Sequence, residues 1–107
     1  MNNPNYDPEQ LQRLDEALGQ LKDQTRMKIV LLLKSNPLPL CVGKIAEVLQ
    51  IEKTLCAFHL RKLAQAKILI VQNQGRNSYY FYDLTTAQAI VAALCNILLP
   101  EQCSETK

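Results

Sequence analysis

The 107-residue sequence predicts a single domain that is mainly α-helical and carries one small β-hairpin. Apolar residues recur at helical spacing over most of the chain, as they do in amphipathic helices. Residues 68–73 and 78–83 are instead rich in β-branched and aromatic side chains, and a polar turn with a glycine separates them. We expect a flexible N-terminal arm over residues 1–8, the domain over residues 9–99 and a polar C-terminal tail over residues 100–107.

Charge is spread unevenly along the chain. The formal net charge is only +2, from 12 basic and 10 acidic residues, so overall charge gives no argument for a nucleic-acid partner. The distribution does give one, because residues 44–76 hold six basic and two acidic side chains. No signal peptide is visible, and no apolar run reaches the roughly 18 residues that a membrane span needs. We therefore expect a cytoplasmic protein without a membrane partner.

The first helix is expected to begin at Asp7, Pro8 and Glu9, with Asp7 as its cap and Pro8 in its first turn. A narrow apolar seam follows on this otherwise polar helix, and it consists of Leu11, Leu14, Leu18 and Leu21. Such a seam suits packing against another helix, either within the monomer or across a dimer.

A second helix is predicted over residues 24–35, with Asp23 as its cap. Met27 and residues 29–33 are all apolar, so this helix is expected to be central and mostly buried. The two prolines in residues 36–39 end it, because proline cannot continue a helix.

Residues 42–63 are predicted to form two short helices joined by a tight corner at residues 50–52. Ile51 is expected to be the buried residue that locks the two helices together. The apolar face of the first helix consists of Val42, Ile45, Val48 and Leu49. The inward residues of the second helix are Cys56, Leu60 and Leu63. This arrangement is a helix-turn-helix.

The outer face of the second of these helices is small, basic and protruding, which fits the DNA major groove, where a helix can reach base edges. The hairpin directly after it is then a wing, whose tip suits phosphate or minor-groove contact. The predicted DNA-binding residues are Lys53, Thr54, Ala57, Phe58, His59, Arg61 and Lys62 on the helix, with Arg76 and Asn77 at the wing tip. The predicted partner is double-stranded operator DNA.

Two residues of this helix have alternative roles. Phe58 lies on a polar face, where it either meets a thymine methyl group or shields a neighbouring loop. His59 is the lone histidine, and its alternatives are a structural role and a phosphate contact. A metal site at His59 is not expected, because no second histidine exists and the cysteines lie elsewhere in the sequence.

A last helix is expected to begin with Thr85 or Thr86 as its cap and to end at Pro100. Residues 86–99 contain no charge, and a terminal helix with so little polar surface is rarely left bare on a monomer. We therefore predict a homodimer built from the first and last helices. Its predicted contact residues are Leu11, Leu14, Leu18, Ile90, Val91, Leu94 and Leu98.

Four segments, in this order, resemble the ArsR/SmtB family of winged-helix repressors. Residues 21–33 resemble the family's opening "L-x-D-x-T-R-x-x-I-L-x-L-L", and residues 40–42 resemble the start of the third helix in its arsenic sensors. Residues 59–63 are similar to the end of its recognition motif "S-x-H-L-x-x-L", and residues 75–82 to its wing, "G-R-x-x-x-Y-x-L". The resemblance implies a homodimeric repressor that leaves its operator when a metal, metalloid or oxidant modifies it.

The sequence departs from this family at three places. Gly43 stands where the arsenic sensors have the second cysteine of Cys-Val-Cys, so the usual paired thiol site lacks a ligand. The Asp and His pairs of the zinc sensors are absent, since His59 is the only histidine. Ala57 and Phe58 replace a serine and a polar residue of the recognition helix, so the family's base preferences do not carry over.

The four cysteines lie far apart and form no zinc pattern. Cys56 is expected to pack as a small hydrophobic residue. The predicted sensing residues are Cys41, Cys95 and Cys103. Thiolates favour soft species, so the candidate inducers are arsenite, antimonite and a reactive sulfur or oxygen species. A three-thiolate metalloid site, a two-cysteine oxidative switch and a regulator without sensing cysteines all stay open, and no cofactor is required.

Two classes of function fit these patterns. The first is a DNA-binding transcriptional regulator, favoured by the basic residues around the second helix of the helix-turn-helix. The second is a winged helix used only for protein interaction, favoured by the near-neutral net charge and by Ala57 and Phe58. An enzyme is not expected, because the sequence shows no nucleophile–base pair, no carboxylate pair and no glycine-rich phosphate loop.

Overall fold

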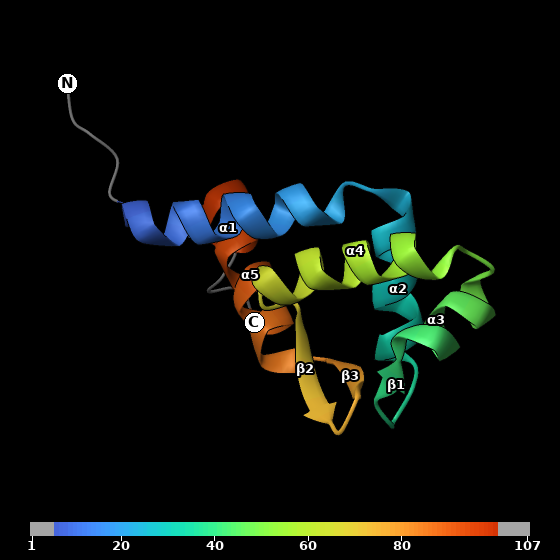
Figure 1. Ribbon diagram of the computed structural model, residues 1–107. Coiled ribbons are helices and arrows are strands. Elements are labelled where there is room, and N and C mark those ends of the chain that lie inside the picture. The colour runs from blue at the N-terminus through green and yellow to red at the C-terminus, as the bar shows by residue number, and fades with distance from the viewer. Residues whose placement is uncertain (1–5, 101–107) are drawn as a thin grey trace.

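The computed structural model describes residues 6–100, which form five helices and one small sheet (Figure 1). The elements are α1 (Pro8–Leu21), α2 (Gln24–Lys34), β1 (Leu40–Cys41), α3 (Val42–Leu49), α4 (Lys53–Gln65), β2 (Leu69–Gln74), β3 (Asn77–Tyr82) and α5 (Leu84–Leu98). The predicted mainly α-helical fold with a β-hairpin wing is confirmed. Among these residues, no helix combines the length and the apolar character that a membrane crossing requires.

The first two helices begin where the sequence predicts. The Asp7 carboxylate accepts a hydrogen bond from the Glu9 backbone N–H at 3.0 Å, and Pro8 stands in the first turn of α1. The Asp23 carboxylate accepts a bond from the Thr25 backbone N–H at 2.7 Å. Both carboxylates satisfy donors that a helix start leaves without intrahelical partners.

The sheet has three strands in the order β1-β3-β2, so the hairpin gains a strand that the sequence did not predict. β1 is antiparallel to β3, with Leu40 opposite Tyr80 and Cys41 opposite Tyr79. Two residues are too few to show the alternation by which a strand is recognised in a sequence. This strand ties the start of α3 to the middle of β3.

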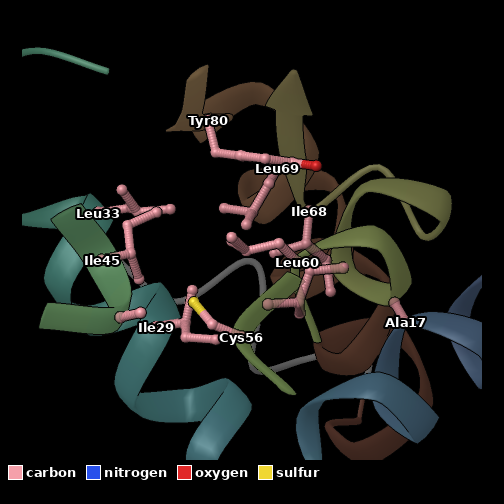
Figure 2. Close-up of a cluster of buried hydrophobic side chains, with 11 residues drawn as sticks. Ala17, Ile29, Leu33, Ile45, Cys56, Leu60, Ile68, Leu69 and Tyr80 are labelled. Carbon is pink, nitrogen blue, oxygen red and sulfur yellow. The ribbon is translucent and has the colours of Figure 1, made fainter. Parts of the chain in front are cut away.

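The hydrophobic core lies between α2, α3, α4 and the sheet (Figure 2). Its largest fully buried side chains are Ile29, Leu33, Ile45, Leu60, Leu63, Leu69 and Cys56. Ala17 brings α1 against the same cluster, and Tyr80 covers it from β3. The helix-turn-helix therefore packs against α1, α2 and the sheet, and α5 contributes Ile90 to this core.

Two expectations about burial are wrong. α2 is not mostly buried, because only Ile29 and Leu33 of this helix are fully buried, while Met27 and Leu31 are exposed. A helix packed on one side buries only one stripe, even where all its residues are apolar. Val48, expected on the inner face of α3, is 46% exposed.

The last helix begins two or three residues earlier than expected. Its cap position is Asp83, not Thr85 or Thr86. The Thr86 hydroxyl donates a hydrogen bond of 2.7 Å to the Asp83 carboxylate, so the threonine orients the cap residue instead of occupying its place. α5 then runs behind α1, and the two helices cross (Figure 1).

Candidate nucleic-acid interface

The corner of the helix-turn-helix depends on a left-handed residue. Gln50 has φ 57° and ψ 48°, and the backbone N–H of Ile51 donates to the Ala46 carbonyl at 3.0 Å. This is the usual way to end a helix with a sharp change of direction. Ile51 is half-buried and packs against the core, as expected of the residue that locks α3 to α4.

α4 has one buried face and one outer face. Cys56, Leu60 and Leu63 are fully buried, as predicted. The exposed side chains on the outer face include Lys53, Thr54, Phe58 and Arg61, while Ala57 and Lys62 are half-buried. We call Lys53, Thr54, Ala57, Phe58, Arg61 and Lys62 the outer face of α4. Its hydroxyl and cationic groups are those with which helices contact bases and phosphates.

His59 is placed inside the protein, only 5% exposed. Its Nδ1 accepts a hydrogen bond of 2.9 Å from the Nε–H of Arg26 on α2. Of the two roles open to His59, the geometry fits the structural one, because a buried imidazole whose Nδ1 is already bonded has little surface for a phosphate. The DNA contact predicted for His59 is therefore corrected.

Arg26 was missed by the sequence analysis, although it joins α1, α2 and α4. Its backbone N–H donates to the Asp23 carboxylate at 3.2 Å, and its guanidinium donates to the Gln20 side chain. The bond from the Arg26 N–H is the largest cause that lowers the pKa of Asp23. No local pattern could have found this role, because Arg26 and His59 lie 33 positions apart in the sequence.

Phe58 has side chains of α2 and α4 around its ring. The His59 ring lies edge-on to it, with 5.6 Å between centroids and 64° between planes. The Arg26 guanidinium carbon is 5.9 Å from the Phe58 centroid, and the Lys62 Nζ is 5.5 Å from it. Both cations are within the range of cation–π attraction. Phe58 is nonetheless 40% exposed.

The wing carries its two predicted residues at an exposed turn. Gly75 has φ 60°, a conformation that glycine adopts without strain, and Arg76 and Asn77 follow it in solvent. The Ser78 hydroxyl donates to the Asn73 side-chain oxygen at 2.7 Å, which joins the two strands next to the turn. Since α4 packs against β2, the wing is fixed relative to α4.

The cysteines have different surroundings. Cys41 is half-buried at the cap position of α3, and Cys95 is exposed on α5. The Cys56 Sγ is 3.9 Å from the Val42 carbonyl oxygen, and burial raises the pKa of its thiol. Cys103 lies outside the described residues. Within residues 6–100, no three potential metal ligands among His, Cys, Asp and Glu side chains come together.

Cys41 and Cys95 are not brought together within one chain. Cys41 belongs to β1, whereas Cys95 is in the last turn of α5. Figure 1 shows β1 and the C-terminal end of α5 on opposite sides of the molecule.

The residues predicted for the dimer divide into two groups. Leu14 is almost fully buried within the chain, so it has little surface left for a second copy. Val91 and Leu98 are 58% and 73% exposed, and Leu11 and Leu18 are partly exposed. Ile90 and Leu94 are half-buried. A groove of about 350 Å³ separates α1, the end of α4 and α5, and its lining includes Leu14, Ala17, Ile90 and Ala93.

Comparison with known proteins gives a family for this arrangement. Residues 23–71 match the model of the bacterial regulatory protein, arsR family. The HTH-type transcriptional regulator YdfF of Bacillus subtilis (strain 168) is 31% identical over 77 residues, which is 72% of this chain. The chain spans about a third of that relative's length, 34%.

Solved structures share the whole fold at lower identity. One is the homodimeric winged helix-turn-helix DNA-binding domain of a Mycobacterium bovis protein, with a TM-score of 0.70, 17% identity and 94% of each chain covered. Another is the AntR antimony-specific transcriptional repressor, with a TM-score of 0.66, 20% identity, and 99% of this chain and 93% of that chain covered. Residues 23–71 of this chain thus match the arsR family of bacterial regulatory proteins, and the whole fold is that of winged helix-turn-helix domains. This family and this fold are those of transcriptional regulators, not of enzymes.

Proposed function

We propose that this protein is a homodimeric repressor that binds double-stranded operator DNA. The outer face of α4 enters the major groove, and Arg76 and Asn77 of the wing contact the phosphate backbone or the minor groove. The observation that carries this proposal is the exposure of Thr54 and Arg61 on α4 beside a wing that α4 itself holds in place. Hydroxyl and guanidinium groups on a helix can contact base edges, and basic groups on a wing can contact phosphates.

The test uses a duplex that the protein selects from a random-sequence pool, so that no operator need be known beforehand. Fluorescence anisotropy then gives its affinity at several salt concentrations. We expect affinity to fall steeply with salt, because each neutralised phosphate releases counterions. Lys28→Ala is the matched control, since Lys28 is an exposed cation of α2 two residues from Arg26 and so on another side of that helix. Binding that neither selects a sequence nor depends on salt would contradict the proposal.

The homodimer is proposed to form through α1 and α5. Val91 and Leu98 present apolar surface that residues 6–100 do not cover. A terminal helix of this kind is expected to be covered by another protein surface. The M. bovis domain, similar in fold, is itself homodimeric, which supports this arrangement.

Sensing is proposed to occur through Cys41 of one protomer and the partner's Cys95 or Cys103. Two chemistries remain candidates: a three-thiolate site for arsenite or antimonite, and a two-cysteine bond formed by a reactive sulfur or oxygen species. The AntR repressor, similar in fold, is antimony-specific. A link to Cys41 would pull on the start of α3 and misalign the two helix-turn-helix units for adjacent half-sites.

Thiol counting separates these chemistries. Arsenite or antimonite protects three thiols per site from alkylation, whereas oxidation removes two. Release of DNA is then measured for Cys41→Ser, Cys95→Ser and Cys103→Ser, with Cys56→Ser as the variant of a buried cysteine. If all of the first three variants still release DNA normally, the protein is a regulator whose cysteines do not sense.

A second candidate is a protein-interaction module that has lost DNA binding. The apolar Ala57 and Phe58 on the outer face of α4 are the observation in its favour. The same anisotropy experiment decides between the two, because an interaction module binds no selected duplex.

A further inference from the structure

Phe58 is the least expected residue on the outer face of α4. A large apolar ring that is 40% exposed lies there among Thr54, Arg61 and Lys62. The sequence left two roles for this ring, a contact with a thymine methyl group and a cover for a neighbouring loop. The structure gives the ring partners on α2 and on α4, which are helices and not a loop.

The ring is held from several directions. Lys62 lies one helical turn further along α4, with its Nζ 5.5 Å from the ring centroid, and His59 meets the ring edge-on. Arg26 approaches from α2, 5.9 Å from the centroid. A side chain with this many neighbours keeps one orientation, so its exposed edge is presented in a fixed place.

Arg26 is itself fixed, which makes it the link between Phe58 and the rest of the fold. Its Nε–H donates to the buried His59 Nδ1 at 2.9 Å, and another of its N–H groups donates to Gln20 of α1. The fork of an arginine can make both bonds while its plane remains near an aromatic ring, and a lysine cannot. The rotation of α4 about its own axis, and with it the direction of Phe58, is therefore set partly by Arg26.

The chemistry of the exposed edge limits what it can contact on DNA. In the major groove the base edges present hydrogen-bond donors and acceptors, and the apolar group among them is the C5-methyl of thymine. We propose that Phe58 is a specificity-determining residue that contacts a thymine methyl group, and that Arg26 is the positioning residue that aims it. This inference rests on the proposed DNA-binding function, and it gives that site a base preference.

The experiment removes the methyl group from the DNA. In the duplex selected from the random-sequence pool, each thymine is replaced in turn by deoxyuridine, which differs only by the missing C5-methyl. We expect wild-type affinity to fall about three- to fivefold at one or two thymines in each half-site, the effect of one buried methyl group. Phe58→Ala should bind the thymine and deoxyuridine duplexes equally at those positions, whereas Phe58→Leu should retain part of the difference.

The Arg26 variants test the positioning role. Arg26→Gln and Arg26→Lys should both reduce the preference for thymine over deoxyuridine at the same positions. Lys28→Ala, the control on α2, should leave that preference unchanged. A merely structural Arg26 would lower affinity for both duplexes by one factor and leave their ratio unaltered.

Several outcomes would overturn the inference. If the wild-type protein binds the deoxyuridine duplexes as tightly as the thymine duplex at every position, it contacts no thymine methyl group. If Phe58→Ala keeps the full difference, another residue reads it. In both cases the selected duplex still binds, so the proposed function stands. If the wild type selects no duplex at all, the proposed function fails, and this inference fails with it.

Discussion

α4 and α5 are of similar length, but they differ in how much of their apolar surface is buried within the chain. α4 buries Cys56, Leu60 and Leu63 completely and leaves a polar and basic outer face. α5 is apolar nearly throughout, yet Ala93 is its one buried residue. The contrast indicates that α4 has its full set of packing partners within one chain, whereas α5 has a surface suited to a second copy. We therefore expect truncations in α4 to lower the stability of the monomer, and changes in α5 to weaken the proposed dimer.

The sharpest test of this contrast is a matched pair of leucine truncations. Leu60→Ala on α4 should lower the free energy of unfolding by about 2–5 kcal/mol, because it leaves a cavity in a fully buried site. Leu98→Ala on α5, where the leucine is 73% exposed, should lower the stability of the monomer by less than about 0.5 kcal/mol. Urea denaturation at a protein concentration where the monomer dominates measures both values. Equal losses of unfolding free energy in the two variants would contradict the claim that α4 and α5 differ in burial.

An effect of similar size is expected on assembly. Val91→Glu places a charge on the exposed apolar face of α5, and a charge buried without a partner at a dimer contact costs about 3–5 kcal/mol. Light scattering should therefore show a folded monomer in place of the dimer, with an unchanged far-UV circular dichroism spectrum. Gln88→Glu, which also adds a negative charge at an exposed position of α5, is the control. If the Val91 variant remains a dimer, the two protomers must contact each other through another surface.

A smaller effect is expected from the wing. Arg76→Ala should weaken binding to all sequences alike and reduce the slope of log affinity against log salt by about one, as the loss of one phosphate contact does. Arg61→Ala should instead relax sequence preference, by about 1–3 kcal/mol, if Arg61 reads a base. Anisotropy titrations on selected and scrambled duplexes distinguish the two patterns. Identical behaviour of both variants and the wild type would favour the protein-interaction module.

The smallest change concerns thiol reactivity. Iodoacetamide should modify Cys95 in the folded protein, because this thiol is exposed, and should not modify Cys56 until the protein unfolds. Burial raises the pKa of the Cys56 thiol, so little reactive thiolate forms there. Peptide mapping after brief alkylation gives the order of modification. Early labelling of Cys56 would mean that the core under α4 opens readily.

The parts of this fold that local patterns determine could be predicted from the sequence. Asp7 and Asp23 cap their helices through backbone donors two or three residues away, and Gly75 marks the hairpin turn by its conformational freedom. The inner face of α4 follows from helical spacing alone. The existence of a helix-turn-helix and a wing could be inferred in the same way.

The parts that depend on distant partners could not be predicted. Arg26 and His59 are separated by 33 positions, and no spacing rule connects them. β1 becomes a strand only because Leu40 lies opposite Tyr80. The exposure of Val48 follows from how α3 packs, which an apolar pattern does not specify. These contacts decide the direction of Phe58 and the burial of His59, and that burial removes His59 from the predicted list of DNA contacts.

Hydroxyl-radical footprinting of the selected duplex tests the central claim most directly. A homodimer with one α4 in each major groove should protect two half-sites, with centres about one helical turn, roughly 10 base pairs, apart or a multiple of it. Val91→Glu should lose the paired pattern, because the monomer has a single α4. Protection of one half-site by the wild-type protein, or no protection at all, would contradict the account.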